Sequence, residues 1–165
     1  MGGVIPEPGA ASLRLARLLA LLVPAALLAG AYGSEYLGGL APCEMCYWQR
    51  YAHWAALALA LLAFVGGGRA AVVLAALAIL ASGGIGAWHA GIELGIFEGV
   101  TECTATATGS GEDLLEQILA APTVRCDEVQ FSFLGISMAG WNAILSAGSA
   151  LVILWLSLRR SRTPA

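Results

Sequence analysis

The stretch YAHWAALALALLAFVGGGRAAVVLAALAILASGGIGAW, from Tyr51 to Trp88, contains two apolar runs separated only by the segment GGGR. Each run approaches the length of a helix that crosses the hydrocarbon core of a bilayer, which takes about 20 residues. Because a connection this short leaves no room for a crossover, the two helices must be antiparallel neighbours. The stretch therefore predicts a pair of membrane-spanning helices at the centre of the chain.

The composition supports a membrane protein throughout. Of 165 residues, 59% are hydrophobic and only 12% are charged, which is too little polar surface for a soluble domain of this size. The net charge of −3 and the absence of a basic stripe give no reason to expect a nucleic-acid partner. The lipid bilayer is the expected environment.

Two further apolar runs extend the pattern on either side of the central pair. We expect one domain, 1–165, that is an all-α integral membrane protein with a bundle of four transmembrane helices, at 13–32, 48–65, 70–90 and 138–158. Gly83, Gly84 and Gly86 are available for close contact between helices. The first run also resembles a secretory signal, but it has no clean cleavage site, so we expect it to be retained.

The arginines predict the orientation of the helices. The chain has no lysine, and six of its eight arginines lie at the N-terminus, in GGGR and at the C-terminus. By the positive-inside rule both termini are cytoplasmic. The two outward loops then contain all four cysteines: Cys43 and Cys46 in the first, Cys103 and Cys126 in the second. In the second loop, GEDLLEQILAAP (111–122) predicts a short amphipathic helix.

Three interpretations compete for these cysteines. Two structural disulfides are the usual use of cysteine in an oxidising compartment. A four-thiolate zinc site is the least favoured, because 22 residues separate Cys103 from Cys126. Redox exchange is the third, and the pair Cys43 and Cys46 favours it, because a disulfide that closes so small a loop removes little entropy from the unfolded chain.

The position of Cys46 suits a reactive thiolate. Pro42 precedes the pair and the second span follows closely, so Cys46 is expected in or near the first turn of a helix, where the macrodipole favours an anion. Arg50 lies four residues further along the same face and is always charged. Both features favour the thiolate, which is the form of cysteine that attacks.

A membrane quinone is the acceptor that suits such a thiolate. The sequence has no flavin, dinucleotide or haem-attachment motif. A quinone dissolved in the membrane takes two electrons, and Arg50 could stabilise the negative charge that develops on its oxygen. The sequence is thus consistent with a thiol enzyme that passes electrons to a quinone.

Several stretches resemble one family, the disulfide bond formation protein B (DsbB) family of the bacterial inner (cytoplasmic) membrane. PCEMCYWQR (42–50) resembles its first cysteine motif, WHAGIELG (88–95) the end of its third helix, and CDEVQFSFLGISMAGWN (126–142) the segment that leads into its fourth helix. The resemblance covers nearly the whole chain. It implies a quinone-dependent oxidase that reoxidises a periplasmic DsbA-like thioredoxin-fold protein and draws on the membrane quinone pool, ubiquinone or menaquinone.

The resemblance also implies an order of electron transfer. Cys103 and Cys126 form a disulfide, and Cys103 takes the mixed disulfide with the reduced partner. Electrons then pass to the Cys43–Cys46 disulfide, and Cys46 donates to quinone beside Arg50. The compact second loop, with acids at Glu112, Asp113 and Glu116, departs from better-known members, and this leaves the identity of the soluble partner open.

Four polar residues near the outward ends of the spans are secondary candidates. His89 either lines a quinone pocket or pairs with Glu93 one turn on, and Gln49 either binds quinone or lies at the interface. His53 is expected to be a hydrogen-bonded histidine inside the bundle, and Asn142 an interhelical hydrogen-bonding residue. No metal ligand is expected among them.

Two alternative functions remain for comparison. One is a vitamin K epoxide reductase-like thiol–quinone oxidoreductase, although there the dithiol that faces quinone comes late in the chain. The other is a non-enzymatic membrane protein whose disulfides only staple its loops, in which replacing Arg50 would have no effect on function.

Overall fold

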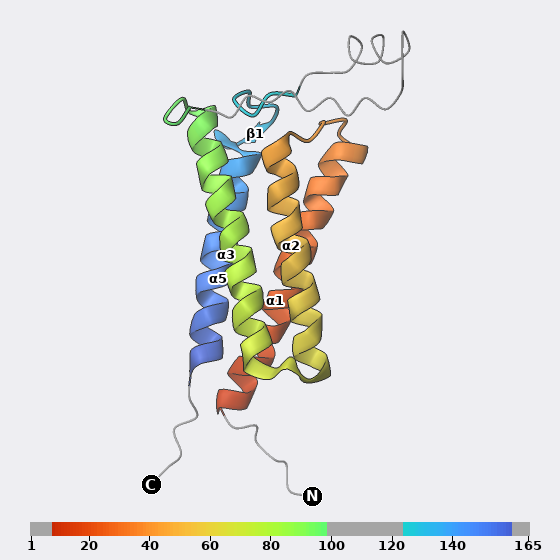
Figure 1. Cartoon of the computed structure of the whole chain (residues 1–165), viewed down its shortest axis with the longest axis vertical. Helices are drawn as coiled ribbons and strands as arrows, with labels where there is room; N and C mark the ends of the chain where they lie inside the picture. The colour runs from red at the N-terminus through yellow and green to blue at the C-terminus, as the bar shows by residue number, and fades with distance from the viewer. Residues whose placement is uncertain (1–7, 99–123, 160–165) are drawn as a thin grey trace, which may run out of the picture.

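The computed structural model describes residues 8–98 and 124–159, and these residues are mostly helical (Figure 1). The helices are α1 (Pro8–Tyr36), α2 (Glu44–Leu62), a π-helical turn η1 (Ala63–Gly67), α3 (Gly68–Glu93) and α5 (Met138–Leu158). Two strands of two residues each, β1 (Ser132–Phe133) and β2 (Ile136–Ser137), form an antiparallel hairpin before α5. The predicted amphipathic helix at 111–122 lies outside the described residues.

Three continuous helical stretches are long and apolar enough to cross a membrane: Ala11–Tyr36, Glu44–Glu93 and Met138–Leu158. The middle stretch has 50 residues and comprises α2, η1 and α3. It reverses direction at η1, where Gly66 has φ 135° and Gly68 has φ 56°. Residues other than glycine rarely adopt such φ values, so the GGG segment permits the reversal. As the short GGGR connection predicts, α2 and α3 run antiparallel side by side (Figure 1).

Small residues bring the helices close together. The helix α3 packs against both α2 and α5, and α1 packs against α2 and α5. The core is rich in alanine, with Ala20, Ala56, Ala60, Ala75 and Ala76 fully buried. Such residues let helix backbones approach closely, which is how helices associate in membranes.

Of the three glycines singled out in the sequence, two make close interhelical contacts. A Cβ atom on Gly86 would lie 2.9 Å from the carbonyl oxygen of Ala139, and one on Gly83 would lie 3.1 Å from the nitrogen of Ala147. A Cβ on Gly84 would meet no atom within 4 Å, so the expectation of a close contact there was wrong. Gly83 and Gly86 face α5 on one side of α3, whereas Gly84 points elsewhere.

The C-terminal end of α1 extends further than the predicted span. The helix continues past residue 32 to Tyr36 and ends where Gly39, at φ 68°, lets its amide bond back to the carbonyl of Glu35. No proline lies between residue 32 and Tyr36. This extension places Ser34 and Glu35 on a helix, at the same end of the bundle as the start of α2, the end of α3 and the start of α5 (Figure 1).

The hairpin fixes the approach to α5. Leu134 and Gly135, both with positive φ (53° and 77°), form its two-residue turn. The Oγ atom of Ser137 then caps α5 by accepting a hydrogen bond of 3.1 Å from the backbone N–H of Gly140. These local contacts hold the segment after Cys126 across the end of the bundle.

Candidate functional site

Cys43 and Cys46 lie together at the start of α2. Cys43 is the N-cap residue, and its Sγ atom accepts a hydrogen bond of 3.3 Å from the backbone N–H of Cys46. The two sulfur atoms are 2.9 Å apart. Cys46 therefore occupies the first helical turn, where unpaired N–H groups favour a negative charge.

The two thiols have different environments. Cys43 is only 1% exposed, whereas Cys46 is partly exposed. The hydrogen bond to Cys46, followed by burial, raises the pKa of the Cys43 thiol. Cys43 thus keeps its proton and can donate it toward the sulfur of Cys46.

His89 lies on the other side of Cys43. Its Nε2 atom is 3.6 Å from the Sγ of Cys43 and 3.8 Å from Oε1 of Glu93, which is four residues further along α3. The second oxygen of Glu93 is buried without a hydrogen-bond partner among the described residues. Of the two suggestions made from the sequence for His89, pairing with Glu93 corresponds to a contact in the structure. The contact with Cys43 is an additional finding.

Gln49 determines which ring nitrogen of His89 carries the hydrogen. Its amide nitrogen donates to the carbonyl of Met45 (3.2 Å), which fixes the orientation of the amide, and also lies 3.1 Å from Nδ1 of His89. Nδ1 must then accept, so the hydrogen of a neutral ring is on Nε2, beside Cys43. The hydrogen-bond network therefore presents a donor to the dithiol.

The same network continues into the bundle. The Nδ2 atom of Asn142 donates to Oε1 of Gln49 (2.8 Å), and Oδ1 of Asn142 is 3.0 Å from Nε2 of His53. Ser82 lies 2.9 Å from the same nitrogen of His53, and Ser146 donates to Asn142. His53 and Asn142 are thus hydrogen-bonded residues inside the bundle, as their places in the apolar spans predict.

Arg50 projects toward α1. Its guanidinium forms an ion pair with Glu35, donates to the carbonyl of Ala31 (3.1 Å), and lies over the rings of Tyr32 and Tyr47 at 4.7 and 5.6 Å from their centroids. The ion pair is partly buried, with side-chain exposures of 7% for Arg50 and 18% for Glu35. Glu35 is not among the residues predicted for the site, because it follows the first apolar run, where the sequence predicts a loop.

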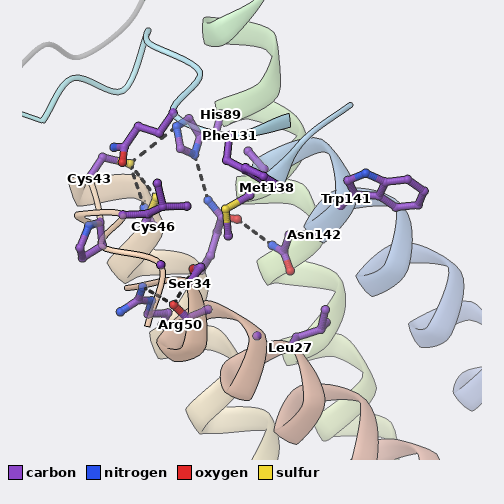
Figure 2. Close-up of a pocket in the computed structure, with 18 of the residues that line it drawn as sticks. Leu27, Ser34, Cys43, Cys46, Arg50, His89, Phe131, Met138, Trp141 and Asn142 are labelled. Atoms are coloured by element: carbon purple, nitrogen blue, oxygen red, sulfur yellow. Dashed lines mark hydrogen bonds between the residues drawn. The ribbon is translucent and has the colours of Figure 1, made fainter. Parts of the chain in front are cut away.

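A cavity of about 650 Å³ joins these groups. Figure 2 shows Cys43, Cys46 and His89 gathered at one end of it, with Arg50 and Asn142 further along and Leu27 at the far side. The wall on the side of α1 and α5 is mostly apolar and includes Leu27, Leu28 and Leu145. A cavity of this size, apolar with a few polar groups at one end, suits a small hydrophobic ligand with a polar head.

The predicted site residues fall into two groups. Cys43, Cys46, Gln49, Arg50 and His89 all line the cavity. Cys126 is also buried, and it is close enough to Cys43 to influence that thiol electrostatically. Cys103 lies outside the described residues, so the structure gives no contact for it.

The dithiol could also hold a soft metal ion in its reduced form. The ligand atoms of Cys43, Cys46 and His89 all lie within 4.8 Å of one another. Formation of a disulfide between the cysteines would remove two of the three ligands, and the tautomer imposed by Gln49 places a hydrogen on the third. The arrangement therefore suits redox exchange better than a permanent metal centre.

A helical membrane protein with a paired dithiol at a helix start, beside an apolar cavity, belongs to the class of membrane thiol oxidoreductases. Comparison with known families agrees: the family described as "Disulfide bond formation protein DsbB" matches residues 13–156. The chain therefore belongs to the DsbB family.

Named relatives support the same assignment. Disulfide bond formation protein B of Marinobacter nauticus is 32% identical over 152 residues, covering 86% of this chain and 90% of the relative. The protein of that name from Azoarcus sp. is 34% identical over 150 residues (82% and 87%), and that from Xanthomonas euvesicatoria is 30% identical over 162 residues (92% and 94%). No solved structure gave a significant match.

Family membership establishes the general activity. The protein is a bacterial inner-membrane oxidoreductase that generates disulfides, and coupling to quinone is the family's role. This assignment decides against the vitamin K epoxide reductase-like and the purely structural alternatives.

Proposed function

We propose that the dithiol of Cys43 and Cys46 is reoxidised by a quinone bound in the cavity, and that a periplasmic DsbA-like thioredoxin-fold protein is the ultimate dithiol donor. The observation that carries the proposal is that one cavity is lined by Cys46, Arg50 and an apolar wall. The wall would accommodate an isoprenoid tail, and the polar end the ring of ubiquinone or menaquinone.

Each residue at the polar end has a specific task. When bound, quinone supplies an acceptor for two electrons and two protons. Cys46 is the sulfur from which the electron pair leaves the chain, since it is the more accessible thiol and lies at the helix start. Arg50 supplies positive charge where the acceptor becomes negative. His89 and Gln49 hold a hydrogen-bond donor against Cys43.

The second cysteine pair supplies the electrons. We propose that Cys103 and Cys126 form a disulfide, which a thiolate of the reduced partner attacks at Cys103. The partner leaves with a new disulfide, and the two electrons and two protons remain on Cys103 and Cys126 as thiols. Exchange with the Cys43–Cys46 disulfide returns the second pair to its oxidised state and reduces the first. The burial of Cys126 close to Cys43 supports this exchange.

Membrane orientation completes the proposal. The chain crosses the membrane four times, with both termini cytoplasmic and both cysteine-bearing loops periplasmic. The distribution of arginine supports this orientation. A dithiol at the periplasmic face can meet both a soluble donor and an acceptor in the lipid.

The test is replacement of Cys46 by serine, which conserves size but removes the sulfur nucleophile. Purified protein is assayed for reduction of a short-chain ubiquinone or menaquinone analogue, driven first by a reduced thioredoxin-fold protein and then by dithiothreitol. With Cys46→Ser, quinone reduction should fall to background with both donors. The matched control, Cys126→Ser, should lose activity with the protein donor but keep it with dithiothreitol, which can reach Cys43–Cys46 directly. Undiminished turnover in Cys46→Ser would refute the proposed route.

A further inference from the structure

Arg50, which lines the cavity, has a negatively charged partner, Glu35. Arg50 is 6% exposed and lines the cavity, whereas Glu35 does not belong to the cavity lining. Whatever Glu35 does for the reaction, it must therefore do through Arg50. The guanidinium also has a neutral partner, the carbonyl of Ala31 at 3.1 Å, and the faces of two tyrosines. Holding the arginine in place does not by itself require a negative charge.

The position of Glu35 is unfavourable without its partner. It lies in the last turn of α1 (Pro8–Tyr36), where the helix macrodipole is negative and disfavours an acid. Its side chain is also largely buried, which disfavours an unpaired carboxylate. Both costs are offset by Arg50. The presence of a glutamate at this position is best explained if its negative charge partly neutralises the positive charge of Arg50.

We propose that Glu35 is a positioning residue that partly neutralises Arg50, and so limits the positive field that the arginine exerts on Cys46 and on the acceptor. A full, unpaired cation at this depth would stabilise the Cys46 thiolate and a negatively charged acceptor strongly. It would also hold the acceptor for as long as the acceptor carries negative charge, and so slow its exchange. With Glu35 in place, Arg50 contributes an attenuated charge. The part of this inference that concerns the acceptor rests on the proposed function; the part that concerns Cys46 does not.

The sign of the effect follows from Coulomb's law. Glu35→Gln removes the negative charge but keeps an oxygen that can accept from Arg50. The net positive charge near Cys46 then rises, so the thiolate fraction should rise with it. A change of half a pKa unit corresponds to about a threefold change in thiolate at a pH below the pKa. We expect at least that increase in the rate of Cys46 alkylation at pH 7.

Other titratable groups surround the same region. They come from every element that packs there: Tyr32 and Tyr36 on α1, Glu44, Tyr47 and Tyr51 on α2, His89 and Glu93 on α3, and Cys43, Arg125, Cys126 and Glu128 around the cavity mouth. In the experiment below, Cys43 and Cys126 are serine in every variant and Glu44 changes only in its own control. A difference among the Glu35 and Arg50 variants therefore reports on this ion pair.

The experiment uses full-length protein without quinone, in which Cys43, Cys103 and Cys126 are replaced by serine so that Cys46 is the single thiol. Serine at 43 preserves an N-cap side chain for α2. The iodoacetamide reaction rate of Cys46 is measured from pH 5 to 9 for Glu35→Gln, Glu35→Asp, Arg50→Gln and the double variant Glu35→Gln/Arg50→Gln. Glu44→Gln, in the first turn of α2, serves as a matched acid that does not act through the arginine.

The expected pattern is specific to a counter-ion. Glu35→Gln shifts the rate profile to lower pH, whereas Glu35→Asp, which keeps the charge, stays near the parent. In the Arg50→Gln background, Glu35→Gln raises the alkylation rate of Cys46 by less than half as much as it does with Arg50 present. Glu44→Gln changes the rate to the same extent with or without the arginine. An unchanged or slower reaction in Glu35→Gln overturns the inference, and so does an equal increase in both backgrounds. If Glu35→Gln does not fold, the other two variants carry the test. The inference then requires that Arg50→Gln loses the thiolate at low pH and that Glu35→Asp reacts at the parental rate. An Arg50→Gln rate profile equal to that of the parent overturns the inference.

A second readout links the counter-ion to turnover. In the otherwise native protein, Glu35→Gln should lower the KM for the quinone analogue by about threefold without raising kcat, because a guanidinium without its counter-ion attracts the partly negative quinone oxygens more strongly. A KM that rises or stays constant would overturn the part of the inference that concerns the acceptor. Failure of the proposed function is recognised separately, by persistent turnover of Cys46→Ser.

Discussion

Asn142 shows how one side chain connects the dithiol region with the interior of the bundle. Its amide donates to Gln49 and accepts from both His53 and Ser146. Gln49 in turn sets the hydrogen of His89 beside Cys43. A polar network in an apolar bundle is stable when its members are paired, and removing one member leaves several groups unsatisfied.

Replacing Asn142 by leucine should therefore destabilise the protein. The change removes a donor from Gln49 and an acceptor from His53, and we expect a loss of about 1–2 kcal/mol in the free energy of unfolding. Thermal unfolding in detergent measures it. The double variant Asn142→Leu/His53→Leu, which removes both partners of one hydrogen bond, should be less destabilised than the sum of the two single changes. Strict additivity would show that the residues do not form one network.

At the scale of elements, the contact between α3 and α5 matters most for the cavity. Gly86 lets α3 approach the start of α5, the segment that carries Met138, Trp141 and Asn142 into the cavity wall. Membrane helices associate through close packing of this kind, since lipid gives no hydrophobic drive. The distance between these two helices thus sets the width of the site.

A methyl group at Gly86 should push the helices apart. In Gly86→Ala the new Cβ would lie 2.9 Å from the Ala139 carbonyl oxygen, which requires a shift of α5 and should cost about 1–3 kcal/mol of stability. Gly84→Ala, two residues away, is the control: its Cβ meets nothing within 4 Å. Thermal unfolding and the KM for a quinone analogue should change for Gly86→Ala alone. Equal effects of the two substitutions would mean that helix propensity, and not packing, governs this region.

The extent of the helices was only partly predictable at this scale. Hydropathy locates an apolar core, and 13–32, 48–65, 70–90 and 138–158 all fall within helical stretches of the structure. Hydropathy cannot tell how far a helix continues into polar sequence. For that reason hydropathy predicts a loop at Ser34 and Glu35, although the chain turns only at Gly38 and Gly39. The two-residue hairpin strands were missed as well, because a turn at Leu134–Gly135 has one non-glycine residue at positive φ.

At the scale of the whole molecule, the helix ends that the structure describes lie at two opposite ends of the bundle. The start of α1, the turn η1 and the end of α5 lie at one end of the bundle, and the dithiol lies at the other (Figure 1). Arg69 and Arg159 both belong to the first of these ends. The positive-inside rule therefore predicts that this end is cytoplasmic.

Labelling from one side of the membrane tests this orientation. In a protein without native cysteines, Ser132→Cys in the hairpin should react with a membrane-impermeant maleimide in intact spheroplasts. Ala70→Cys, beside the η1 turn, should react only after permeabilisation. Both positions are exposed in the structure, so accessibility to solvent alone does not separate them. The reverse pattern would place the dithiol in the cytoplasm and rule out exchange with a periplasmic partner.

The sequence by itself determined the properties that depend on local order along the chain. The length of the apolar runs predicts the membrane helices, and the segment GGGR predicts their tight reversal. The spacing of Cys43 and Cys46 just before a helix predicts a dithiol at the N-terminus of that helix. Each of these predictions depends on neighbouring residues only. Only the tertiary structure decided that Arg50 pairs with Glu35, that Gln49 orients His89, and that α1 and α5 supply the apolar wall. These contacts join residues that lie 15 to 40 positions apart or on different helices. They depend on helix rotation and separation, which the packing of small residues such as Gly86 sets and which no local pattern records.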